Sequence, residues 1–183
     1  MDRPWILTEI DGKVASVAAD WRHFARIAAE VARLGPETVG SVSTRRLSTD
    51  ELVALDTQLR WEDLRLFGST FQKGIWKALY DLTHAPGAEP RLYSYSDIAA
   101  LAGKAPGVRA VAHGVAVNPV AYIIPCHLVI PKESMDRVRS IRRSAEQTLF
   151  KGADLYLIDS IDVGEYAYGP ALKRELIRRQ LSR

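Results

Sequence analysis

Residues 93–119 read YSYSDIAALAGKAPGVRAVAHGVAVNP, and this stretch decides the fold of the second half of the chain. Ser94 followed three residues later by Asp97 forms a capping box, so the spacing predicts that a short helix begins here. A glycine-containing turn follows, and a second helix is predicted from Val108 until Asn118 and the proline after it end the helix. Two short helices joined by such a turn are typical of a helix-turn-helix.

The second of these helices has unusually small side chains, with alanine at 110, 112 and 116 and glycine at 114. Small residues allow close approach, either of a neighbouring helix or of a ligand such as nucleic acid. Arg109 lies in the first turn of the helix, where it is either a solvated side chain or one aimed at nucleic acid from a recognition helix. The residues alone leave both questions open.

A second notable segment, IIPCHLVIP at 123–131, contains Cys126, the only cysteine of the chain. Prolines bracket the pair formed by Cys126 and His127 and stiffen its backbone. A thiol reacts as the thiolate, so it needs a lowered pKa or an adjacent base. A lone cysteine can equally be an inert, small core residue.

Length and composition indicate a globular protein. The chain has 183 residues, of which 47% are apolar and 26% charged, enough for a sizeable core. No window approaches the ~18 consecutive apolar residues of a membrane span. The first residues lack a signal-peptide pattern, and one cysteine cannot form an internal disulfide, so we expect a reducing cytoplasm.

The charge is unevenly distributed along the chain. Residues 1–65 carry 9 Lys/Arg and 11 Asp/Glu, a net of −2, and residues 66–183 carry 16 and 11, a net of +5. A basic surface favours a polyanion as partner, although a solvated face would look the same.

The sequence of the N-terminal third predicts a small α/β unit. Asp11-Gly12 lies between two apolar stretches and indicates a hairpin, and residues 21–33 have helical apolar spacing. Ser48 and Glu51 form a capping box before another helix. No catalytic pattern is present, and Gly68 marks the expected domain boundary.

Several motifs together resemble one protein family. The segment NPVAYIIPCH (118–127) closely resembles the NP…IPCHRV signature of the O6-alkylguanine-DNA alkyltransferases, also called methylated-DNA–protein-cysteine methyltransferases. Four further segments match the family in the same order: FQKGIWKAL (71–79), YSYSDIA (93–99), AGKAPGVRAVAHGVAVNP (102–119) and EYAYGPALKRELI (165–177). The resemblance covers roughly residues 68–131 and 164–180.

The resemblance implies an α/β fold, with a small N-terminal α/β domain (1–66) and a mainly α, winged-helix-like (helix-turn-helix) alkyltransferase domain (67–183). It implies DNA repair by stoichiometric, suicide transfer of the alkyl group from O6-alkylguanine in double-stranded DNA to Cys126. The helix-turn-helix would bind the minor groove, and the damaged base would flip into a pocket. We expect a cytoplasmic monomer with no cofactor, no metal and no membrane partner.

Two alternative functions stay open. The first is a lesion-recognition protein that transfers slowly or not at all. The second is a helix-turn-helix regulator whose thiol senses oxidants, which requires reversible chemistry at Cys126.

The resemblance also implies roles for single residues. Cys126 would accept the alkyl group, His127 would take the thiol proton through a water, and Asn118 would tie the recognition helix to the active-site segment. The remaining implied residues are Gln180, which would orient the histidine; Tyr95, Val129 and Tyr166, which would bind the substrate; and Arg109, Ala110, Gly114 and Ser94, which would bind DNA.

Three features depart from the family pattern. Leu128 stands where arginine is usual, and Gln180 stands where a glutamate is usual. An amide brings no negative charge to support an imidazolium, so slower transfer or another proton route is expected. Finally, 36 residues separate Val129 from Tyr166, several times the usual spacing, which defines an inserted segment at 132–163. Its net positive stretch at 137–151 is either a solvated surface helix or an added phosphate contact.

Overall fold

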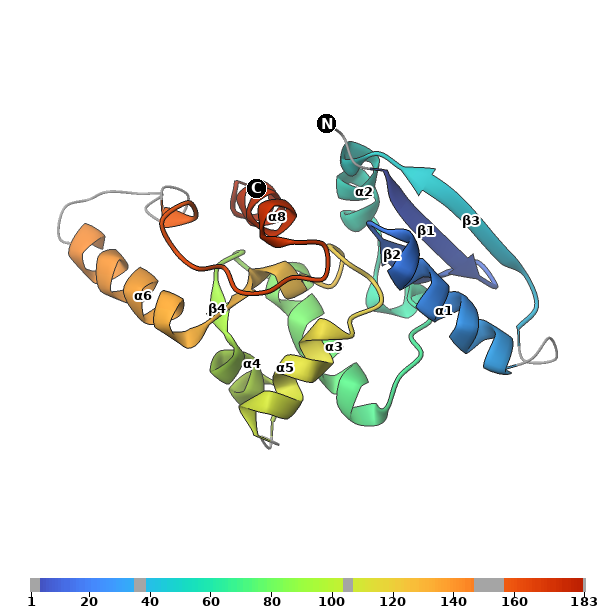
Figure 1. The fold of residues 1–183 in the computed structure, drawn as a ribbon, viewed down its shortest axis with the longest axis horizontal. Coiled ribbons are helices and arrows are strands. Elements are labelled where there is room, and N and C mark those ends of the chain that lie inside the picture. Colours follow the sequence, from blue (N-terminus) through green and yellow to red (C-terminus); the bar gives the residue numbers. More distant parts are fainter. Residues whose placement is uncertain (1–3, 35–38, 104–106, 147–156, 183) are drawn as a thin grey trace.

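The computed structural model describes residues 4–34, 39–103, 107–146 and 157–182. A three-stranded sheet lies at one end of the molecule, and a group of helices makes up the rest (Figure 1). This arrangement confirms the expected α/β fold class. None of the described helices is long and apolar enough to cross a membrane.

The sheet has the strand order β2-β1-β3 and is antiparallel, with β1 (Trp5–Ile10) in the centre, β2 (Lys13–Ala18) on one side and β3 (Val42–Leu47) on the other. The turn between β1 and β2 has positive φ at both central residues, 52° at Asp11 and 74° at Gly12. Two positive φ values define the tight turn that suits a twisted hairpin. The predicted hairpin is therefore confirmed.

The helices of the N-terminal third are α1 (Trp21–Leu34), α2 (Thr49–Asp56) and the short 3-10 helix η1 (Trp61–Asp63). Helix α2 begins with the predicted capping box, in which Ser48 and Glu51 bond to each other's backbone N–H groups. These bonds satisfy donors that the first helical turn would otherwise leave unpaired.

The remaining described elements are α3 (Thr70–His84), β4 (Tyr93–Ser94), α4 (Tyr95–Leu101), α5 (Val108–Ala116), η2 (Cys126–Leu128), β5 (Val129–Ile130), α6 (Lys132–Glu146) and α8 (Pro170–Leu181). Helices α4 and α5 form the predicted helix-turn-helix pair, and α4 begins with the predicted cap between Ser94 and Asp97. Strands β4 and β5 pair in parallel, which fixes the start of α4 beside the segment after Cys126.

Helix α5 packs closely on α3 through Gly114. A Cβ atom at this position would lie 2.5 Å from Ile75 Cδ1. The Gly114 carbonyl oxygen also accepts a hydrogen bond of 2.9 Å from Trp76 Nε1. The expectation that Gly114 faces DNA is therefore corrected: this glycine is small because α3 lies against it.

The main hydrophobic core extends across the expected boundary between residues 66 and 67. It joins Trp5 and Leu7 of the sheet to Ile75 and Trp76 of α3. The division into two domains stays a prediction, because one continuous core contains residues from both sides of it.

The inserted segment leaves the main fold and returns to it at nearly the same place. A Cβ atom at Gly164, where φ is +75°, would lie 3.0 Å from Pro131 Cδ. Met135 and Val138 of α6 belong to a second core cluster, which also contains Leu128. Leu128, in place of the family's usual arginine, is therefore explained by the apolar cluster that the insertion covers.

We expect Gly114→Val to destabilise the protein by about 1–3 kcal/mol, because its methyl groups would overpack the contact with Ile75. The control is Ala54→Val on the exposed face of α2, with an expected loss within about 0.6 kcal/mol from helix propensity. Denaturant unfolding measures both free energies, and equal losses would contradict the packing role.

Candidate active site

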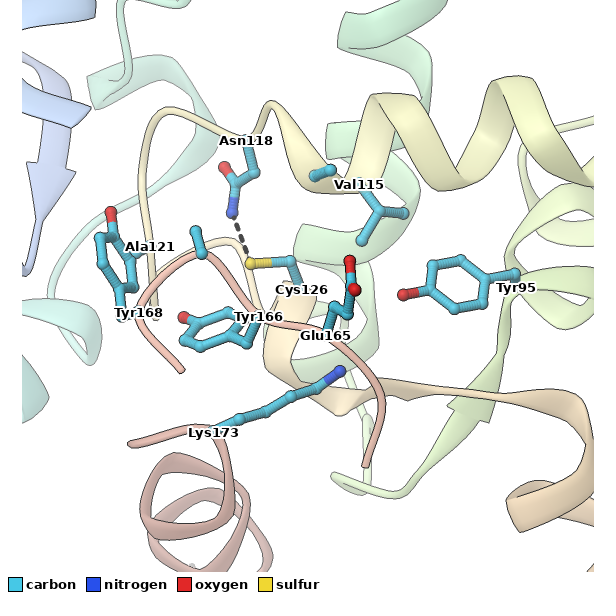
Figure 2. Close-up of a pocket in the computed structure, with 11 residues that line it drawn as sticks. Tyr95, Val115, Asn118, Ala121, Cys126, Glu165, Tyr166, Tyr168 and Lys173 are labelled. Atoms are coloured by element: carbon cyan, nitrogen blue, oxygen red, sulfur yellow. Dashed lines mark hydrogen bonds between the residues drawn. The ribbon is translucent and has the colours of Figure 1, made fainter. Parts of the chain in front are cut away.

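Cys126 is the first residue of η2, and its side chain is 8% exposed. That exposure is to a cavity of about 320 Å³ (Figure 2). The cavity wall comes from four parts of the chain: Tyr95 of α4, Val115 and Ala116 of α5, Asn118, Ala121 and Cys126 of the segment after α5, and residues 165–168 with Lys173 near the C-terminus.

Asn118 holds the active-site turn together. Its Nδ2 group donates to the Ile124 carbonyl oxygen at 2.8 Å and to Cys126 Sγ at 3.1 Å. Its Oδ1 atom accepts from the Val120 N–H at 3.0 Å. The predicted link between the recognition helix and the thiol segment is thus present as hydrogen bonds on one buried amide.

The N-terminal sheet supports the same turn from outside. The Val17 N–H of β2 donates to the Pro119 carbonyl oxygen, and the Ala121 N–H donates to the Val17 carbonyl oxygen, each at 3.0 Å. These two backbone hydrogen bonds to Val17 fix the position of the turn relative to the sheet.

His127 is fully buried and is not among the residues that line the cavity. Its ring stacks on Tyr122, with centroids 5.4 Å apart and planes 4° from parallel. Tyr122 has a φ of 73°, a conformation that non-glycine residues adopt rarely. The turn therefore separates the two neighbours, so that the thiol borders the cavity and the imidazole lies within the protein.

Gln180 lies on α8, which packs against η2, and its side chain is buried. Its Oε1 atom has no hydrogen-bond partner among the described residues. A buried acceptor is stabilised when a donor bonds to it, so Gln180 Oε1 suits a neighbouring N–H or O–H group, which such a bond would orient. Its implied action on His127 stays a prediction.

Burial raises the pKa of the Cys126 thiol, because the cavity wall solvates a thiolate poorly. The hydrogen bond from Asn118 opposes this rise most strongly, and the charge of Lys173 and the Tyr166 hydroxyl act in the same direction as Asn118. Burial therefore disfavours the thiolate of Cys126, and Asn118, Lys173 and Tyr166 favour it.

Lys173 is a buried lysine whose Nζ donates to the Val129 carbonyl oxygen at 2.7 Å. Burial lowers its pKa to about 8, and the nearby Cys126 opposes that shift. At neutral pH the side chain is still mostly protonated, so it presents a cation beside the thiol (Figure 2).

Two of the three residues implied to bind the substrate line the cavity, and the third does not. Tyr95 and Tyr166 line the cavity. The pKa of Tyr95 is raised by burial and then by Cys126 and Glu165. Val129 does not line the cavity: its side chain is buried in the main core, and it contributes through its carbonyl oxygen instead. Its implied role in binding the substrate stays a prediction.

The residues implied to contact DNA differ in exposure. Arg109 is exposed in the first turn of α5, and Ala110 beside it is half-buried. Ser94 is buried, and its hydroxyl is bonded to Asp97 in the cap of α4. Ser94 therefore acts on α4 and not as a surface contact.

Comparison with known proteins connects part of the chain with one family. The model of the 6-O-methylguanine DNA methyltransferase DNA-binding domain matches residues 70–148, which include α3, the helix-turn-helix pair and the thiol segment. Residues 70–148 are therefore similar to the DNA-binding domain of the 6-O-methylguanine DNA methyltransferases.

Two curated relatives carry this family's name. The chain is 43% identical over 72 residues to a probable methylated-DNA–protein-cysteine methyltransferase of Acanthamoeba polyphaga mimivirus, covering 39% of this chain and 45% of the relative. It is 46% identical over 70 residues to the methylated-DNA–protein-cysteine methyltransferase of Methanosarcina barkeri, covering 37% and 41%. The match spans under half the length of these relatives.

The fold extends beyond the matched segment. The crystal structure of a variant of the Mycobacterium tuberculosis O6-methylguanine methyltransferase superposes with a TM-score of 0.52 at 21% identity, covering 98% of this chain and 87% of that one. This likeness concerns the fold alone.

Sequence reasoning about the methyltransferase motifs missed several cavity residues, chiefly Glu165, Tyr168 and Lys173. Tyr168 is held edge-on by Trp5 of β1, with centroids 6.1 Å apart. Lys173 had a visible signal, because it is a charged residue on the side of α8 that also carries Leu172 and Leu176, both of them buried. Nothing in the local pattern singles out Glu165.

We expect Lys173→Met to raise the pKa of Cys126 further, because it removes a cation that favours the thiolate. The pH dependence of iodoacetamide alkylation, followed by intact mass, measures the midpoint. Arg178→Met on the exposed side of α8 is the control and should leave the midpoint unchanged. A midpoint that falls in Lys173→Met would contradict the assignment.

Proposed function

We propose that this chain repairs duplex DNA by transferring the alkyl group of O6-alkylguanine to Cys126, once per molecule. The observation that carries the proposal is the position of the sole thiol, which borders a cavity that α4 and α5 also line. The volume of about 320 Å³ lies at the small end of the range for small-molecule sites. A base can reach such a cavity only after leaving the helical stack.

The proposed chemistry is one displacement. The sulfur attacks the alkyl carbon attached to O6, a carbon–sulfur bond forms, and the carbon–oxygen bond breaks. The bonding electrons pass to guanine, and a proton equivalent to the one lost from the thiol restores N1–H. No oxidant, reductant or cofactor is needed, because atoms and charges balance between the thiol and the base.

The surrounding residues would lower the barrier by favouring the thiolate. Asn118 donates to Sγ, and Lys173 supplies a positive charge nearby. A thiolate in a water-poor cavity is a strong nucleophile. In this proposal His127 receives the thiol proton through a water, and Tyr95 helps turn the nucleotide out and borders the base.

The single cysteine suits a protein used once. A thioether has no good leaving group, so the alkylated sulfur is not regenerated, and no resolving cysteine is required. The alternative of an oxidant-sensing regulator is disfavoured, because sensor thiols are exposed and have a low pKa, whereas Cys126 is buried and its pKa is raised.

We further propose that the partner is double-stranded DNA containing O6-alkylguanine and that the protein acts as a cytoplasmic monomer. The basic balance of residues 66–183, with 16 Lys/Arg and 11 Asp/Glu, supports a polyanion as partner. The absence of any second cysteine suits a reducing compartment.

We expect a duplex with one O6-methylguanine to add one methyl group to the peptide that holds Cys126, with no more than one methyl per protein molecule. Intact and peptide mass measure the transfer, and Cys126→Ser should gain nothing. Binding of the duplex without any gain in mass would favour the lesion-recognition alternative.

We expect Arg109→Ala to slow transfer from duplex DNA by about 10- to 100-fold, because extruding a base costs a few kcal/mol that an inserted side chain helps to offset. Transfer from the free base O6-benzylguanine should be unchanged, since no base is extruded. Arg60→Ala, exposed and far along the chain, is the charge-matched control. If Arg109→Ala slowed transfer from free O6-benzylguanine as much as transfer from duplex DNA, a role of Arg109 in extruding the base would be contradicted.

A further inference from the structure

We propose that a hollow between α4 and α6 binds a backbone phosphate of duplex DNA beside the lesion, so that the inserted helix widens the DNA-binding surface. The inference rests on the function proposed above. The hollow has a volume of about 350 Å³ and lies where Arg139 of α6 bonds to Asp97 of α4. Its polar wall consists of Arg91, Asp97, Arg139 and Arg142.

The charge of this wall fits an anion. Three arginines line the hollow with Asp97, and Asp136 lies 3.6 Å from Arg139 Nη1, so three positive charges stand against two negative ones. The carboxylate of Asp97 is already engaged by Arg139 Nη2, at 2.7 and 2.8 Å. The planar guanidinium groups of Arg91 and Arg142 match the geometry of phosphate oxygens.

Arg91 and Arg139 are held in place before any ligand arrives. Arg91 lies over the Tyr93 ring, 5.2 Å from its centroid, and its Nε donates to the Tyr93 hydroxyl at 3.1 Å. The bond from Arg139 to Asp97 ties α6 to α4, and Met135 anchors α6 in the second core. Prior ordering reduces the entropy lost on binding.

The position along α4 suits DNA that is engaged at the cavity. Helix α4 has Tyr95 of the cavity at its first residue and Leu101 of the hollow at its last. Seven residues span about 10 Å, which is a few nucleotide steps along one strand. The first helix of a helix-turn-helix usually crosses the DNA backbone. Leu101 is 57% exposed and offers an apolar wall for a deoxyribose.

The test uses Arg91→Ala combined with Arg142→Ala in the full chain, and leaves Arg139 in place so that the bond between α4 and α6 survives. Fluorescence anisotropy measures the affinity for a duplex over a series of KCl concentrations. We expect the slope of log affinity against log salt to flatten by about 1, because one phosphate contact contributes about 0.9.

Two further variants serve as controls. Arg45→Ala with Arg46→Ala removes the same charge from the exposed strand β3 and should leave the slope nearly unchanged. Arg91→Lys with Arg142→Lys keeps the charge and should restore most of the slope. Thermal melting checks that each variant is folded.

The outcomes separate this inference from the proposed function. A wild-type slope in the folded double alanine variant, or equal flattening in the β3 control, overturns the phosphate site alone. Transfer from free O6-benzylguanine should be equal in all variants. If the wild-type chain neither binds duplex DNA nor takes its methyl group, the proposed function fails, and the phosphate site fails with it.

Discussion

The side-chain amide of Asn118 lies where α5 ends and the active-site turn begins, and the position of the thiol depends on its hydrogen bonds. The nitrogen donates to the Ile124 carbonyl oxygen and to Cys126 Sγ, and the oxygen accepts from Val120. Without this amide the turn would hold unpaired buried polar groups, each costing about 1–3 kcal/mol. The same amide fixes the sulfur at a set distance from α5, the helix expected to meet DNA.

The site reconciles two opposing demands on one sulfur atom. Exclusion of water forms a cavity for a base, yet it also disfavours the thiolate that must react. The structure offsets this with a hydrogen bond from Asn118 after α5 and with the positive charge of Lys173 on α8. After the inserted segment, the chain passes beside Pro131 at Gly164. It then lines the cavity with residues 165–168 and with Lys173 of α8.

The sheet and the insertion both act on the site, although neither carries the family's motifs. Val17 of β2 bonds on both sides of the active-site turn, and Trp5 of β1 holds Tyr168 against the cavity. The insertion covers Leu128 with an apolar cluster, places α6 against β4 and joins it to α4 through the Arg139–Asp97 ion pair. These additions surround the motif segments and fix their positions.

The sequence by itself determined the features that depend on neighbours a few residues apart. The caps at Ser48 and Ser94, the hairpin at Asp11-Gly12 and the helix-turn-helix pair all formed as predicted, because each is stabilised by local hydrogen bonds and backbone preferences. The thiol also stood out, since its motif is a continuous segment.

Only the tertiary structure decided which face of each element meets which partner. Gly114 turned toward α3, Val129 turned into the core, and Lys173 bonded to a carbonyl oxygen 44 residues away in sequence. Such contacts join elements that are distant along the chain, and a local pattern records only that a residue is small, apolar or charged. The direction of each side chain was fixed when the helices and strands packed together, because burial and hydrogen bonding then selected one arrangement.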